Sequence, residues 1–274
     1  MAMTNIADYI EKVEIDALWN GRRHIVWNLR RDVNILSGVN GVGKSTILNR
    51  VIRHLLNEAH VVDTNLRGVT VKLAPEGCDA VRFDVIRSFD RPLLRGDMFD
   101  KVADTQLNSE LDLQLYQLQR RYLDYQVNAS KRIVELFTKG DPQAQQKAQE
   151  IAGEKAHFQD LVDDLFQETG KRIDRESNEI VLLQLDERLS PYKLSSGEKQ
   201  MLLILLTVLV EDNEPYVLFM DEPEISLHID WQKRLIGLIR ELNPNAQIIL
   251  TTHSPAVIMD GWTDCVTDVE DIVV

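Results

Sequence analysis

The sequence has little cysteine and no long apolar run, and both absences limit what the protein can be. Its 274 residues include two cysteines, Cys78 and Cys265, which lie far apart and lack the spacing of metal ligands. Sparse cysteine of this kind fits a reducing compartment, so we expect a cytoplasmic protein. The longest apolar stretch, MLLILLTVLV at 201–210, is shorter than the roughly 18 apolar residues of a membrane span. No secretion signal is predicted either, and we expect no membrane partner.

Positive charge is also scarce. The chain carries 31 Lys and Arg against 44 Asp and Glu, a formal net charge of −13. Coating nucleic acid by bulk charge needs clustered basic residues that neutralise phosphates, so this composition argues against it. Two short clusters, GRRH at 21–24 and LRR at 29–31, leave a local nucleic-acid face open, although short basic clusters are more commonly solvated surface.

The sequence does contain a glycine-rich loop, LSGVNGVGKSTI at 36–47, which fits the pattern G-x-x-x-x-G-K-[ST]. Strand-like segments precede it, and a helical pattern of apolar residues follows from Ile47 to Leu56. In this context the loop's amides and the helix N-terminus bind nucleotide phosphates, Lys44 reaches the β and γ phosphates, and Ser45 ligates Mg²⁺. The residues assigned to ATP binding here are Gly38, Asn40, Gly41, Val42, Gly43, Lys44, Ser45 and Thr46.

A second element, YVLFMDEPE at 216–224, is an apolar run that ends in acidic residues. A buried parallel strand delivers carboxylates to its C-terminal edge in this way. In a P-loop protein an acid at this place holds Mg²⁺, a role that fits Asp221. Glu222 beside it is positioned to polarise the water that attacks the γ phosphate.

From about 105 to 170 the pattern changes to long helices. Apolar residues recur at alternating steps of four and three, which is the seam of a coiled coil or helical hairpin. Asp141 and Pro142 fit the N-cap and first residue of a second helix. A bundle packed on the main core and a projecting arm are equally open interpretations. The seam consists of Leu111, Leu115, Leu118, Tyr122 and Tyr125.

Three further segments carry a family resemblance: LSSGEKQ at 194–200, SLHIDWQ at 226–232 and TTHSP at 251–255. Together with the P-loop and the acidic strand, they resemble ABC-type P-loop ATPases of the SMC/RecF-like branch. That branch includes the ATPase domains of OLD-family nucleases and related bacterial anti-phage defence ATPases. The resemblance implies an α/β fold with a mixed sheet, flanking helices and, in this chain, an inserted helical hairpin.

The resemblance also implies roles for particular residues. Ser195 and Gly197 open a helix that contacts the γ phosphate held by another subunit, and His253 senses that phosphate. Ser196 stands where a glycine is usual, and its side chain predicts a weaker contact. By itself, Ser195 with Glu198 three residues later is also a simple helix capping box.

The implied organisation has three parts: an N-terminal lobe over 1–104, a helical insertion over 105–172 and a C-terminal lobe over 173–274. The glutamine that usually supports Mg²⁺ has no clear counterpart, although Gln106 precedes the insertion. Trp19, Arg22 and Arg23 are candidates for contacting the adenine base.

Since the P-loop and the signature lie on opposite edges in this family, the resemblance implies a head-to-tail homodimer that holds two ATP molecules with Mg²⁺. We therefore expect an ATP-hydrolysing, nucleotide-gated clamp or scaffold that regulates a separate effector, such as a nuclease or toxin, in anti-phage defence. Two alternatives stay open: a DNA-binding repair ATPase of RecF/SMC type and a transporter's nucleotide-binding subunit. The effector, the trigger and assemblies beyond a dimer are not encoded in any motif.

Overall fold

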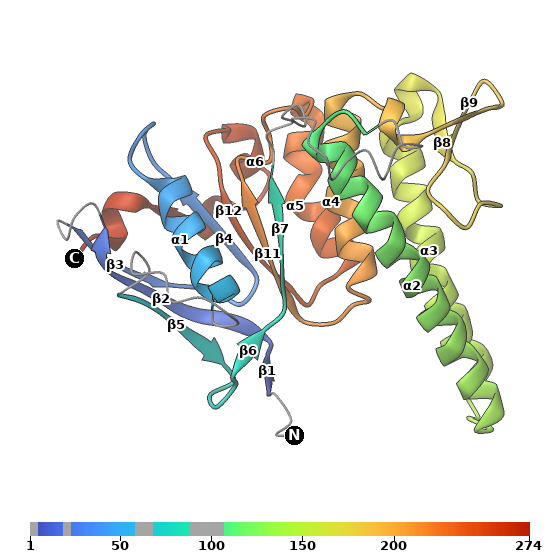
Figure 1. Ribbon diagram of the computed structural model, residues 1–274, viewed down its shortest axis with the longest axis horizontal. Coiled ribbons are helices and arrows are strands. Elements are labelled where there is room, and N and C mark those ends of the chain that lie inside the picture. Colours follow the sequence, from blue (N-terminus) through green and yellow to red (C-terminus); the bar gives the residue numbers. More distant parts are fainter. Residues whose placement is uncertain (1–4, 19–22, 58–67, 88–106) are drawn as a thin grey trace, which may run out of the picture. The chain divides into compact units, whose positions relative to one another are not determined.

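The computed structural model describes residues 5–18, 23–57, 68–87 and 107–274, which form two compact units (Figure 1). The first unit comprises Met1–Ser88, Asn213–Arg240 and Pro244–Val274, and the second comprises Phe89–Asp212 with Glu241–Asn243. The lobe boundary expected at 104 falls among residues outside the described part of the chain. The expected C-terminal lobe, 173–274, contributes to both units.

A five-stranded parallel sheet forms the centre of the first unit. Its order is β13-β4-β12-β11-β7, and every neighbouring pair runs parallel. The three central strands are buried almost throughout, as apolar runs in a parallel sheet should be. The strands are β4 Val33–Ser37, β7 Phe83–Arg87, β11 Tyr216–Asp221, β12 Ala246–Thr251 and β13 Val266–Asp268.

An antiparallel sheet of order β3-β2-β5 completes this unit, so the fold is mixed, as expected. The pair Asn20-Gly21 predicts a hairpin turn between two strands. Strands β2 and β3 pair antiparallel, and the predicted turn lies outside the described residues. The phosphate-loop helix α1 packs against both sheets and buries its apolar face between them. The remaining elements here are β1 Ile6–Ala7, β2 Tyr9–Leu18, β3 Arg23–Asn28, α1 Lys44–Asn57, β5 Val69–Ala74, β6 Ala80–Val81, α5 Ile229–Leu242 and α6 Pro255–Met259.

A buried glutamine joins the two sheets. The Gln247 side chain on β12 is 0% exposed, and its oxygen accepts a hydrogen bond from Ile10 N at 2.8 Å. Its amide group donates to Ile10 O at 2.8 Å and to Arg30 O at 2.7 Å. This single side chain therefore satisfies backbone groups of β2 that lie away from water.

We expect Gln247→Leu to lower the free energy of unfolding by about 2 to 4 kcal/mol, because it leaves buried backbone groups of Ile10 without this partner. Urea denaturation measures the change. The control Gln145→Leu, at an exposed position of the second unit, should stay within about 0.5 kcal/mol of the original chain. An equally small effect at Gln247 would mean that Ile10 finds other partners.

Helices dominate the second unit. The seam residues of α2 are all buried, and α2 packs along both α3 and α4 (Figure 1). Lys199 at the start of α4 pairs with Asp112 at the start of α2 at 2.7 Å, and Arg132 pairs with Asp212 just beyond α4 at 2.6 Å. The elements are α2 Glu110–Thr138, α3 Ala144–Leu165, β8 Lys171–Ile173, β9 Leu182–Gln184, β10 Glu187–Leu189 and α4 Ser196–Val210.

Burial along α2 divides the insertion into two parts. Up to Tyr125, α2 buries its seam, whereas Val127, Val134 and Phe137 farther along are exposed by 57% or more. The proximal part of α2 therefore belongs to a bundle, whereas its distal part pairs mainly with α3, apart from the Arg132 contact with Asp212.

One local prediction for this unit is wrong, and another is correct only in part. The N-cap of α3 is Gln143, because Asp141 accepts the Gln143 N–H at 2.8 Å and holds a turn before the helix begins. The stretch EIVLLQL at 179–185 predicts a strand. The strand forms only over β9, because the backbone of Ile180 hydrogen-bonds with the side chain of Gln119 on α2 instead of a neighbouring strand.

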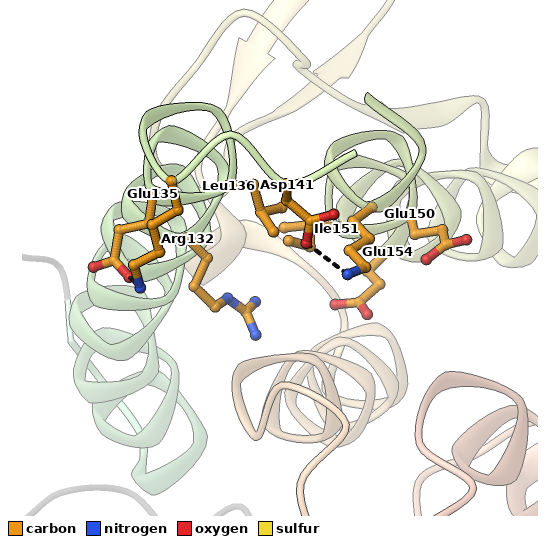
Figure 2. A pocket seen from close by; sticks show the side chains of 9 residues that line it. Arg132, Glu135, Leu136, Asp141, Glu150, Ile151 and Glu154 are labelled. Carbon is orange, nitrogen blue, oxygen red and sulfur yellow. Dashed lines mark hydrogen bonds and ion pairs between the residues drawn. The ribbon is translucent and has the colours of Figure 1, made fainter. Parts of the chain in front are cut away.

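A cavity of about 420 Å³ lies between the distal ends of α2 and α3 (Figure 2). Leu136 and Ile151 contribute its apolar lining. Charged residues at its edge pair with one another, as Lys147 does with Asp141 at 2.7 Å. Lys139 pairs with Glu135 at 3.0 Å and Arg132 with Asp212 at 2.6 Å, so the cationic groups of the lining already have carboxylate partners.

Candidate functional site

The loop between β4 and α1 has the backbone that its glycines allow. Gly38 has a φ of +144°, and a Cβ atom there would lie 2.9 Å from Val42 Cγ1. Gly43 has a φ of +104°, directly before α1 begins at Lys44. Such conformations are open to glycine and costly for other residues. The loop ends at the N-terminus of a helix, which is a ready anion-binding position.

Lys44, the first residue of α1, is only 4% exposed. Its ammonium group donates to Gly38 O at 3.1 Å and lies 2.6 Å from His253 Nε2. A charged ammonium has no lone pair, so Nε2 has to be the acceptor in this contact. Burial lowers the pKa of Lys44, and the carboxylates of Glu222 and Asp221 oppose that shift.

Asp221 and Ser45 meet at the carboxyl edge of the sheet. Ser45 Oγ donates to Asp221 Oδ1 at 2.9 Å, and Thr251 Oγ1 donates to the same oxygen at 2.6 Å. The described residues hold no cluster of three or more His, Cys, Asp or Glu side chains that could bind a metal. A hydroxyl with one carboxylate nevertheless suits Mg²⁺, which takes few protein ligands and keeps several waters.

Glu222 follows Asp221 in a strained backbone conformation, with a φ of +48°. Its N–H donates to Thr251 O and to Thr251 Oγ1, each at 3.1 Å. Strain of this kind costs on the order of 1 kcal/mol and is common at active sites. The Glu222 carboxylate is partly exposed and lies 3.3 Å from His253 Nε2.

Five predicted site residues thus converge in the first unit: Lys44, Ser45, Asp221, Glu222 and His253. They converge because β4, β12 and β11 are adjacent parallel strands, whose carboxyl ends meet at one edge. Sequence reasoning gave no role to Thr251, Glu224 or Gln232, which hold this edge together. No spacing rule marks them, because each acts by a contact with a residue distant in sequence.

The signature belongs to the second unit. Ser195 is the N-cap of α4, and a capping box with Glu198 forms as its residue types allow. One Glu198 oxygen accepts from Ser195 Oγ at 2.9 Å and the other from Lys171 Nζ at 2.7 Å. Gly197 lies in the first turn of the helix. The structure therefore gives Ser195 a structural contact, and its part in binding phosphate stays a prediction.

The other expected contacts are only partly described. Arg23, a candidate for contacting adenine, pairs with Glu270 at 2.8 Å. Trp19, Arg22 and Gln106 lie outside the described residues. Across the described helices, none is both long enough and apolar enough to cross a membrane.

One protein family and several relatives match this chain. The AAA_21 family, described as "AAA domain, putative AbiEii toxin, Type IV TA system", matches residues 81–260, about two thirds of the chain. The "Septu protein PtuA" of Bacillus thuringiensis is 47% identical over 49 residues, which are 18% of this chain and 12% of that protein. The "Retron Vc95 probable ATPase" of Vibrio cholerae is 29% identical over 91 residues, covering 29% of this chain and 18% of that protein.

The matched segments thus span less than a fifth of the length of these two relatives. Segments of similar size also match an ABC transporter A family member and a phosphate import ATP-binding protein. Among solved structures, an Smc head bound to the C-winged helix domain of ScpA is similar over 92% of this chain and 91% of that chain, with a TM-score of 0.55 and 16% identity. This likeness concerns the fold.

Proposed function

Because the chain belongs to the AAA_21 family of AAA domains and has the fold of an SMC/RecF-like P-loop ATPase, we propose that it binds and hydrolyses ATP at the site around Lys44. The observation that carries this proposal is the convergence of five side chains at one sheet edge. Lys44 and Ser45 begin α1, Asp221 ends β11, and His253 follows β12. Lys44 contacts His253 at 2.6 Å, and Ser45 contacts Asp221 at 2.9 Å.

Each side chain has a role that follows from its chemistry. The Lys44 ammonium binds phosphate oxygens, and Ser45 with Asp221 would hold Mg²⁺. That ion neutralises phosphate charge when bound. Glu222 accepts a proton from the attacking water, and His253, which contacts both Lys44 and Glu222, senses the terminal phosphate.

We further propose that each ATP site is completed by Ser195 and Gly197 of a second copy, in a head-to-tail homodimer. The support is the motif order of the family, in which the signature acts in trans. ATP bound between two copies favours the closed dimer only through contacts that the open state lacks. Hydrolysis would remove those contacts, so nucleotide controls assembly.

The dimer would regulate a separate effector in bacterial anti-phage defence. The family description names a toxin of a type IV toxin–antitoxin system, and the matched relatives include a Septu protein and a retron ATPase. These names support a defence setting and an effector protein such as a nuclease or toxin.

The signature variant Ser195→Arg tests the shared site. We expect it to bind ATP like the original chain but to hydrolyse it about 10²-fold more slowly, because the bulky side chain blocks the contact made in trans. The hydrolysis rate per chain should rise with chain concentration only in the original protein. Ser130→Arg, at an exposed position on α2, is the matched control.

A mixture of two variants, each defective in one half of the proposed site, tests the dimer directly. Equal amounts of Ser195→Arg and Lys44→Ala should recover about a quarter of the original rate, because half of the dimers pair unlike chains and each of these holds one complete site. If Ser195→Arg alone keeps the original rate at every concentration, the site is complete within one chain and the dimer proposal is wrong.

A further inference from the structure

The carboxylate of Glu224, three residues after Asp221, is buried beneath the loop that carries His253. It is 7% exposed, and its Oε1 accepts from Thr252 Oγ1 at 2.6 Å and from His253 N at 2.9 Å. Ser254 N shares its hydrogen between Glu224 Oε1 at 3.3 Å and Thr252 Oγ1 at 2.9 Å. One oxygen therefore holds three consecutive residues of the loop after β12.

Gln232 on α5 connects the loop after β11, which carries Glu224, to the loop after β12, which carries His253. Its oxygen accepts from Ser254 Oγ at 2.6 Å, and its amide donates to Leu227 O at 2.9 Å and Glu224 O at 3.2 Å. The backbone on either side of Glu224 is thus tied to the loop that begins at Thr252. The peptide group before His253 is held through its N–H, and the hydroxyls of Thr252 and Ser254 on either side are also hydrogen-bonded, so the backbone there has little freedom to rotate.

From these contacts we infer that Glu224 is a positioning residue of the ATPase reaction. It fixes the backbone at His253 and so sets the imidazole 2.6 Å from the Lys44 ammonium and 3.3 Å from the Glu222 carboxylate. Glu224 acts on the site by hydrogen bonds to the His253 loop, and its charge also opposes the lowering of the Lys44 pKa by burial. This inference rests on the proposed function, because it takes His253 to be part of the working site.

Two substitutions of Glu224 can separate the effect of its hydrogen bonds from the effect of its charge. All three contacts fall on Oε1, whereas Oε2 is buried and accepts no hydrogen bond from the described residues. A glutamine can therefore keep an acceptor oxygen for the loop while removing the negative charge. An alanine removes both, and leaves the His253 N–H without its acceptor.

The test combines kinetics with a signal from the histidine itself. We expect Glu224→Ala to lower kcat for ATP hydrolysis by about 10- to 100-fold, the cost of a misplaced group, while equilibrium ADP affinity stays within about threefold. Glu224→Gln should stay within about threefold of the original kcat. The double variant Glu224→Ala with His253→Ala should be no slower than His253→Ala alone, since both changes remove the same effect.

The second measurement is the NMR signal of the His253 imidazole, identified among the six histidines by its loss in His253→Ala. It should shift in Glu224→Ala and stay in place in Glu224→Gln and in Glu76→Ala, an exposed control in the same unit. An unmoved signal in Glu224→Ala, or rate losses that add in the double variant, would overturn the inference. Absence of ATP hydrolysis by the original chain would instead overturn the proposed function, whatever the histidine signal does.

Discussion

Lys44→Ala should lower kcat/KM for ATP hydrolysis by about 10³-fold, because one preorganised charge that faces the phosphates is lost. The ammonium group is 4% exposed and is held in the loop by contacts with Gly38 O and His253 Nε2, which phosphate oxygens would replace. Initial rates at several ATP concentrations give the change. Equilibrium ATP binding should weaken in the same variant.

Stability separates this effect from misfolding. Burial lowers the pKa of Lys44, which means that the folded protein disfavours its charged form. Replacing Lys44 by alanine should therefore not lower the thermal unfolding midpoint. Lys233→Ala, which removes a partly exposed lysine of α5 paired with Asp230, should leave both rate and stability unchanged. A Lys44→Ala chain with ordinary kcat/KM would show that this loop does not bind the reacting phosphates.

Glu222→Gln should lower kcat by about 10²- to 10⁴-fold, the usual contribution of a general base. The amide cannot take a proton from water, but it fits the same backbone conformation and leaves Lys44, Ser45 and Asp221 in place. ATP binding should therefore persist. Because hydrolysis is what opens the proposed dimer, this variant should accumulate as an ATP-bound dimer.

Light scattering after gel filtration measures that outcome, with saturating ATP and Mg²⁺ and again without nucleotide. The control Glu76→Gln, at an exposed position, should hydrolyse ATP at the original rate. If Glu222→Gln stays monomeric with saturating ATP, the clamp is the wrong account of this chain. If it hydrolyses ATP normally, another group accepts the proton.

Local pattern was sufficient for several parts of the fold. The apolar run before Asp221 is a fully buried parallel strand, and the seam from Leu111 to Tyr125 is buried along α2. The pattern failed where a side chain replaced an expected backbone partner. Gln119 satisfies the backbone of Ile180 and ends a strand early, and Asp141 holds a turn instead of capping α3.

The sequence by itself determined the chemistry of the candidate site, since Lys44, Ser45, Asp221, Glu222 and His253 stand in motifs whose residue types fit phosphate, metal and proton transfer. Only the tertiary structure decided what holds them: Thr251 bonded to Asp221, Glu224 beneath the His253 loop and Gln247 between the sheets. The physical reason is the distance along the sequence between the residues that make contact. A motif records neighbours along the chain, whereas these supports are contacts between strands and loops that meet only when the sheet forms.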